Sequence, residues 1–229
     1  MWRSMWKSKF KWATNRGHQE KQGNQKKRKP AQFHAQDKYF DMAKAQGYRA
    51  RSAFKLIEIQ EKFNLIEEGM DVCDVWAAPG SFIQYIKRII RDTGQIVGID
   101  IKPVDKYSQK NINTIVHDIF EYDTLKPKVE EFIGEDNQFD LITSDIAPNT
   151  TGRKDVDQFA SVELNIEILK FSDRFLKKWW NLLLKIFKWE DFHDIVKPIK
   201  SRFARFTEIK PYACRDRSVE EFIICWNKK

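Results

Sequence analysis

The chain of 229 residues, 41% of them hydrophobic, is long enough for one sizeable α/β domain with an appendage and too short for two ordinary domains. No stretch approaches the roughly 18 to 20 consecutive apolar residues of a membrane span, and the basic beginning has no apolar run of signal-peptide length. The three cysteines, Cys73, Cys214 and Cys225, have neither metal-ligand spacing nor an even number, so we expect reduced thiols, a cytoplasmic location and no metal site.

The positive charge is concentrated at the beginning of the chain. Residues 1–36 contain ten of the 41 Lys and Arg residues but one of the 33 acidic residues, so the remainder is close to neutral. An arm this polar cannot bury enough apolar surface to fold alone, and its charge suits contacts with nucleic-acid phosphates. We therefore predict a disordered basic arm over residues 1–36 that contacts RNA, with a solubilising tail as the alternative, and a globular domain over residues 37–229.

Helical and strand patterns alternate through the rest of the chain. Two helical segments come first, one ending at Gly47 and the other covering residues 51–66. Strands are then predicted at Met70–Val75, Gln95–Asp100, Asn113–His117, Phe139–Ser144, Leu182–Phe187 and Glu220–Cys225. Helices are predicted at Ser81–Arg91, Lys126–Ile133, Val156–Lys177 and Trp189–Lys200. This alternation favours an α/β fold with a mostly parallel sheet and helices on both faces, in which the final strand can run antiparallel at or near an edge.

Acidic residues lie at or just after the ends of the first three predicted strands, at Asp74, Asp100 and Asp118. Open parallel sheets bind ligands beyond the carboxyl ends of their strands, so these side chains are expected at one site. Asp100 lies twenty residues after Gly80, a spacing that suits a ribose diol and is equally compatible with NAD. The turn "AAPG" lacks the G-x-G-x-x-G pattern that binds a pyrophosphate, which favours S-adenosylmethionine as the cofactor.

Six segments together resemble the FtsJ/RrmJ family of RNA 2′-O-methyltransferases. In chain order they are "GYRARSAFKL" (47–56), "DVWAAPGSF" (74–82), "GIDIKP" (98–103), "SDIAPNTTG" (144–152), "LLLKIFKWEDF" (182–192) and "RDRSVEEFII" (215–224). The resemblance covers about residue 37 to the end. It implies a Rossmann-like S-adenosylmethionine-dependent methyltransferase fold with a mostly parallel seven-stranded sheet, helices on both faces, and RNA as the substrate.

The same resemblance implies two sets of site residues. Matching motif by motif places a catalytic tetrad at Lys55, Asp145, Lys185 and Glu220. The adjacent Glu221 competes for the last position, but a period of two along the final strand puts Glu220 on the face of Phe222, in register with the family's closing strand. The implied cofactor-binding set is Gly80, Phe82, Asp100, Asp118 and Asp145.

Lys185 is the residue on which the predicted chemistry depends. It lies inside the apolar run "NLLLKIF", where a buried strand is expected to carry a hydrophobic side chain. A lysine accepts the proton of a ribose hydroxyl only if burial or a neighbouring cation lowers its pKa toward neutrality. We therefore assign Lys185 as the base or ribose-orienting group, with Lys55 as the second cation; the alternative is a strand-end lysine that reaches water.

The resemblance implies methylation of a uridine ribose in large-subunit ribosomal RNA by a monomer that acts on the assembling subunit. A transfer RNA ribose is the first alternative. The second is a noncatalytic RNA-binding or ribosome-assembly protein of the same fold, against which the complete tetrad argues. Phosphate contacts are predicted for the basic residues that flank the motifs, Arg49, Arg51, Arg153, Lys154, Lys210, Arg215 and Arg217.

The eight tryptophans stand where glycine would be expected. Trp76 is in the middle of the cofactor turn, and Trp179 and Trp180 lie where a helix is predicted to end, at a position that needs tolerance of positive φ; the family carries glycine at these positions. The chain has nine glycines, where the usual share would give about 16. We hypothesise that these residues are glycines encoded by UGA; the alternative is a tryptophan-rich variant that stacks on bases. With tryptophan at position 76, weak cofactor binding is expected.

Overall fold

The structure is a computed structural model that describes residues 38–148, 151–188, 193–214 and 218–229. The chain divides into two units, residues 1–35 and 36–229, and all the described residues belong to the second. The predicted basic arm over residues 1–36 therefore lies outside the described part. No helix within the described part is both long and apolar enough to cross a bilayer.

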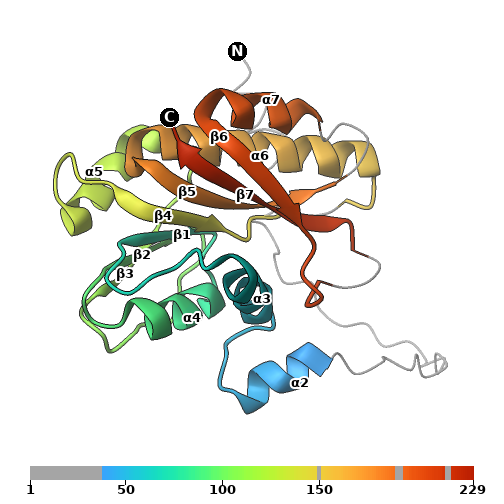
Figure 1. Ribbon diagram of the computed structural model, residues 1–229. Coiled ribbons are helices and arrows are strands. Elements are labelled where there is room, and N and C mark those ends of the chain that lie inside the picture. The colour runs from blue at the N-terminus through green and yellow to red at the C-terminus, as the bar shows by residue number, and fades with distance from the viewer. Residues whose placement is uncertain (1–37, 149–150, 189–192, 215–217) are drawn as a thin grey trace, which may run out of the picture. The chain divides into compact units, whose positions relative to one another are not determined.

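The domain is built on one mixed sheet of seven strands in the order β3-β2-β1-β4-β5-β7-β6 (Figure 1). Neighbours among β1 to β5 are parallel, whereas β7 is antiparallel to both β5 and β6. The mostly parallel seven-stranded sheet is thus confirmed, with the antiparallel strand next to the edge. The strands are β1 (Val72–Val75), β2 (Ile96–Asp100), β3 (Ile112–Val116), β4 (Phe139–Ser144), β5 (Leu176–Phe187), β6 (Phe203–Ile209) and β7 (Glu220–Lys228).

Two layers of helices cover the two faces of the sheet (Figure 1). One layer contains α3 (Ala53–Phe63) and α4 (Ser81–Ile90), and α2 (Lys38–Ala45) precedes it. The other layer contains α5 (Tyr122–Ile133), α6 (Lys154–Phe175) and α7 (His193–Arg202). Each layer buries a separate hydrophobic core, as expected when parallel strands are covered on both sides.

The alternation of side chains along β5 and β7 decides which core each residue faces. On β5, Leu182 and Leu184 belong to the core under α5, α6 and α7, whereas Leu183 belongs to the core under α3 and α4. On β7, Phe222 lies in the core under α3 and α4. Because side chains alternate with a period of two, Lys185 and Glu220 project from the face that α3 covers.

The structure adds one strand to those predicted and moves the ends of several elements. Strand β6 was not predicted, because its burial shows no clear alternation between covered and exposed positions at the sheet edge. The helix predicted at 156–177 is α6, which ends at Phe175, and β5 begins at the next residue, so the strand is longer than predicted. The helix predicted at 126–133 begins earlier, at Tyr122.

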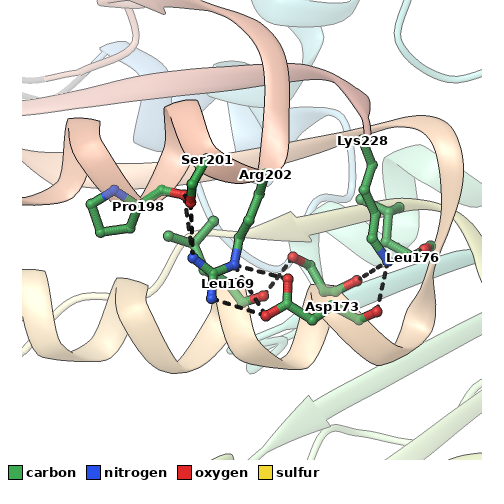
Figure 2. Close-up of polar contacts among 8 residues, drawn as sticks. Leu169, Asp173, Leu176, Pro198, Ser201, Arg202 and Lys228 are labelled. Carbon is green, nitrogen blue, oxygen red and sulfur yellow. Dashed lines mark hydrogen bonds and ion pairs between the residues drawn. The ribbon is translucent and has the colours of Figure 1, made fainter.

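A lysine of β7 caps the carboxyl end of α6 (Figure 2). The ammonium of Lys228 donates hydrogen bonds to the carbonyl oxygens of Ser172, Asp173 and Leu176, at 2.7, 2.8 and 2.5 Å. Arg202 of α7 binds the Asp173 carboxylate at 2.8 Å. These contacts supply partners for carbonyls that a helix end leaves unpaired, and so fix the point at which α6 passes into β5.

Candidate active site

The site lies at the carboxyl edge of the parallel strands. β1 is flanked by β2 on one side and β4 on the other, so the chain departs in opposite directions from this point of the sheet. Such a switch point leaves a crevice beyond the strand ends where ligands bind in open α/β sheets. Asp74 is the last but one residue of β1, Asp100 is the last residue of β2, and Asp145 directly follows β4.

Two lysines and two carboxylates meet at this edge of the sheet. Lys185 Nζ lies 2.9 Å from Asp145 Oδ1 and donates a 2.6 Å hydrogen bond to the Asp145 carbonyl oxygen. Lys55 Nζ lies 3.4 Å from the same Oδ1 and 2.9 Å from Glu220 Oε1. The structure therefore brings the four predicted tetrad residues together, from α3, the end of β4, β5 and β7.

Glu221, the competitor for the fourth position, lies elsewhere. Its carboxylate is 3.2 Å from Lys188 Nζ, which also binds Glu208 of β6. Glu220 and Glu221 are neighbours on a strand and so project to opposite faces, and only Glu220 faces α3. The geometry thus separates the two candidates, although a catalytic role for Glu220 stays a prediction.

Both lysines of the cluster are buried. The side chains of Lys55 and Lys185 are 9% and 6% exposed, so both ammonium groups are largely removed from water. Burial alone lowers the pKa of Lys55, but the carboxylates of Asp145 and Glu220 outweigh it and hold the pKa above its usual range. Lys55 therefore remains a cation at neutral pH and is unsuited to accept a proton. The role of Lys185 as the base stays a prediction.

The backbone of Lys185 is also held in place. Its carbonyl oxygen accepts a 3.0 Å hydrogen bond from the side-chain amide of Asn165 on α6. On the other side of the sheet, Lys55 lies 5.8 Å from the ring centroid of Phe222, so an aromatic face limits where its ammonium can move. The cluster is thus supported from both helical layers.

The turn between β1 and α4 is fastened to β2. The amide of Trp76 donates to the Ile99 carbonyl at 2.7 Å, and the amide of Ala78 donates to Asp100 Oδ2 at 2.8 Å. A carboxylate oxygen accepts more than one hydrogen bond, so Asp100 retains acceptor sites for a ribose hydroxyl. Gly80 has a φ of +103°, and a Cβ there would lie 2.3 Å from Tyr107 Oη. The backbone conformation therefore favours glycine at this position, and a side chain would also have to displace the ends of Tyr107 and Arg49.

In two other members of the predicted cofactor set, Asp118 and Phe82, the side chain makes contacts within the fold. Asp118 follows β3 and accepts a 3.0 Å hydrogen bond from the amide of Phe120, so it shapes the turn before α5. The side chain of Phe82 is 3% exposed and packs 6.5 Å from the ring of Phe222, within the core under α3 and α4. Only the backbone of Phe82, at the start of α4, is therefore suitably placed to face a cofactor.

A model of the FtsJ-like methyltransferases matches residues 48–228 of this sequence. The chain belongs to this family. The FtsJ-like chain is 37% identical over 193 residues to ribosomal RNA large subunit methyltransferase E of Desulfatibacillum aliphaticivorans, covering 84% of this chain and 91% of that protein. It is 34% identical over 189 residues to the protein of the same name from Methanocaldococcus jannaschii, covering 82% and 77% of the two chains.

Solved structures agree with the FtsJ-like fold. A crystal structure of a proposed ribosomal RNA methyltransferase from Plasmodium falciparum has a TM-score of 0.70 and 26% identity, covering 79% of this chain and 98% of that one. Aeropyrum pernix fibrillarin, crystallised with S-adenosyl-L-methionine, has a TM-score of 0.53 at 15% identity and covers 76% of each chain. At 15% identity, the similarity to fibrillarin shows only that the fold is shared. The Rossmann-like methyltransferase architecture is confirmed.

One buried carboxyl near the tetrad, that of Asp74, belongs to neither of the two sets of site residues that the resemblance implied. Asp74 accepts a 2.8 Å hydrogen bond from Thr143 Oγ1 on the neighbouring strand β4. Burial, opposed by this hydrogen bond and reinforced by Asp145 and Asp100, raises the pKa of Asp74 to about 8. Asp74 was identified as a strand-end acid, but its partner follows from the register between β1 and β4, which the sequence does not display.

The basic residues predicted to contact RNA phosphates mostly have partners within the FtsJ-like domain. Arg49 donates to the Pro79 carbonyl at 3.1 Å and stacks on Tyr107, and Arg153 pairs with Asp155. Arg51 and Lys210 donate to backbone carbonyls of the loop between β6 and β7. Arg215 and Arg217 lie outside the described residues, and Lys154 is described as the first residue of α6. The RNA contacts stay a prediction.

The four described tryptophans fall into two groups. Trp76 and Trp179 have φ values of +71° and +70°, in the left-handed region that favours glycine. Trp179 lies in β5 where the pairing with β4 shifts register, rather than at a helix end as predicted. Trp180 and Trp226 are not among the positive-φ residues, and Trp226 donates from its indole to Thr207 at 2.9 Å. Backbone conformation thus supports the glycine hypothesis at two positions. Trp2, Trp6, Trp12 and Trp189 lie outside the described residues.

Proposed function

We propose that this FtsJ-like methyltransferase transfers a methyl group from S-adenosylmethionine to a ribose 2′-hydroxyl, a uridine ribose of large-subunit ribosomal RNA. The observation that carries the proposal is the pair of buried lysines that share the Asp145 carboxylate beside the crevice. The names of the relatives, which are ribosomal RNA large subunit methyltransferases, support the substrate class. We further propose a cytoplasmic monomer that acts on the assembling subunit.

The residues around the turn fit a cofactor of this kind. Asp100 lies at the strand end with acceptor sites for a ribose diol, and the positive φ of Gly80 forms the turn that leads into α4. Asp118 and the backbone of Phe82 border the same crevice in our assignment, and Asp145 joins it to the lysines. When bound, the cofactor supplies an electrophilic methyl group on a sulfonium. The turn has no pyrophosphate cradle, which agrees with a cofactor that carries no phosphate.

The lysines and carboxylates have separate roles in the proposed reaction. Lys55, held as a cation by Asp145 and Glu220, donates a hydrogen bond to the acceptor ribose and fixes its orientation. Lys185, beside a second cation and 6% exposed, is the group that accepts the proton from the 2′-hydroxyl as the oxygen attacks the methyl carbon. Lys185 takes part as the neutral amine and becomes an ammonium when it accepts the proton, while Asp145 holds the side-chain nitrogens of both lysines in place.

The proposal is tested by labelled methyl transfer from S-adenosylmethionine to undermethylated large ribosomal subunits, with transfer RNA alongside. The protein carries Trp76→Gly, and Lys185→Met in that background is the control, because methionine keeps the length of the side chain without the amine. We expect label in the subunit that becomes resistant to alkali, since 2′-O-methylation blocks cleavage, and no label with the control. Label only in transfer RNA would change the substrate, and subunit binding without label would favour a noncatalytic assembly protein.

A further inference from the structure

The loop between β6 and β7 presents one aromatic side chain to solvent. Pro211, Ala213 and Cys214 of this loop are buried, whereas Tyr212 between them is 88% exposed. No large hydrophobic side chain in the described part of the chain is more exposed. The ring of Tyr212 therefore contributes little to the packing of the loop that carries it.

The backbone of this loop is nevertheless fixed to α3. The carboxylate of Glu58 accepts hydrogen bonds from the amides of both Tyr212 and Ala213, at 2.5 and 2.9 Å. Arg51 donates to the Ala213 carbonyl, and Ala213 packs in the cluster that contains Phe54 of α3. A carboxylate, a guanidinium and an apolar contact hold the backbone of this loop, so little backbone entropy is lost when a flat ligand stacks on the ring of Tyr212.

The same contacts place Tyr212 at the rim of the active site. Glu58 follows Lys55 by three residues on α3, so the two side chains lie one above the other on the same helix face. Two residues beyond Tyr212, Cys214 packs in the same hydrophobic core as Phe222, which follows Glu220 by two residues on β7, so the loop passes close to the tetrad. Burial and the carboxylate of Glu220 also raise the pKa of Cys214 to about 12. Tyr212 is thus linked to Lys55 through one turn of α3 and to Glu220 through its own loop.

We propose that Tyr212 is a substrate-binding residue on which a base of the single-stranded RNA segment, at or next to the acceptor nucleotide, stacks during methyl transfer. Sequence-specific RNA proteins commonly take unpaired bases onto exposed aromatic rings, and stacking is tolerant of base identity because every base has a π-face. A base stacked on the ring is held by a loop that is bound to α3, the helix that carries Lys55, while the lysines orient the ribose. The inference rests on the proposed RNA substrate.

Three variants test the role of the ring. Tyr212→Leu keeps an apolar side chain but no π-face, Tyr212→Phe keeps the ring without the hydroxyl, and Phe159→Leu is the matched change at another exposed aromatic residue, which is 56% exposed on α6. Binding of each protein to undermethylated large subunits is measured without cofactor, so that the turn at Trp76 has no influence. We expect Tyr212→Leu to weaken binding about tenfold and the other two to bind within about twofold of the parent.

Two results would overturn the inference. Equal binding by Tyr212→Leu and the parent would show that no base stacks on the ring, and equal loss in Tyr212→Phe would assign the effect to the hydroxyl. Binding and methylation of subunits by the parent protein, which keeps Tyr212, distinguish failure of this inference from failure of the proposed function. A parent that binds and methylates subunits while Tyr212→Leu binds equally well refutes the stacking residue alone, whereas a parent that neither binds nor methylates subunits refutes both. Unchanged melting temperatures confirm that each variant is folded.

Discussion

Replacing Trp76 by glycine should strengthen cofactor binding without stabilising the fold appreciably. At a φ of +71°, a residue with a side chain costs about 1–2 kcal/mol. The turn cannot relax by moving away, because the amides of Trp76 and Ala77 both donate to the Ile99 carbonyl, at 2.7 and 3.1 Å. Glycine removes the strain and the indole from the turn but loses the contact of the indole with the core and raises unfolded-state entropy by about 0.5–1 kcal/mol.

Trp179→Gly is the matched control, since it has the same backbone conformation in a different place. Its φ is +70°, its side chain is 72% exposed, and it lies in the amino-terminal half of β5, away from the carboxyl edge where the cofactor turn lies. With little packing to lose, this variant should be stabilised by about 0.5–1 kcal/mol, equivalent to a melting temperature about 2 °C higher. Its affinity for S-adenosylmethionine should equal that of the parent.

Calorimetric titration with S-adenosylmethionine distinguishes the two variants. We expect Trp76→Gly to bind at least about tenfold more tightly than the parent, a difference of about 1.4 kcal/mol, with a melting temperature within about 2 °C of the parent. Equal affinities of Trp76→Gly and Trp179→Gly for S-adenosylmethionine would refute the argument that the indole of Trp76 obstructs cofactor binding. The origin of the residues is tested separately by reading their codons, where UGG at positions 76 and 179 would exclude glycine encoded by UGA.

Other variants test the tetrad and the buried carboxyl of Asp74. Glu220→Gln should lower the rate of methyl transfer about 100-fold while Glu221→Gln stays within about threefold; similar rates would contradict the assignment made from the strand face. Lys185→Met should lower the rate by at least about 100-fold with unchanged binding of S-adenosylmethionine, and a matched loss of binding would make it a structural residue. Asp74 has a raised pKa, so its contribution to stability is fully present at low pH and is lost as pH rises toward about 8. Asp74→Asn should therefore raise the melting temperature at pH 9 more than at pH 5, and an equal change at both would exclude the titration.

The sequence predicted the strands that are buried on both faces, because their apolar runs are bounded by turn residues. It did not predict β6, an edge strand whose exposed positions carry no regular pattern. It also missed the first half of β5, since "LKKWWN" is half polar and is held in the sheet by pairing with β4 across an irregular register. Which residues belong together in the site was implied by family motifs, and Glu220 was separated from Glu221 by strand periodicity together with the register of the family's closing strand. The partners of Asp74 and the fixed backbone around Tyr212 depend on contacts between segments distant in the chain, which no local pattern contains.

Strand β7 comes after β6 in the chain but lies between β5 and β6 in the sheet. During synthesis the ribosome releases β5 and β6 first, so β5 has an unpaired edge until residues 220–228 leave the exit tunnel. Those same residues bring Glu220 to Lys55 and Lys228 to the end of α6. The last strand therefore completes the sheet, the helix cap and the active site in one event. A nascent chain that stalls before this point lacks all three.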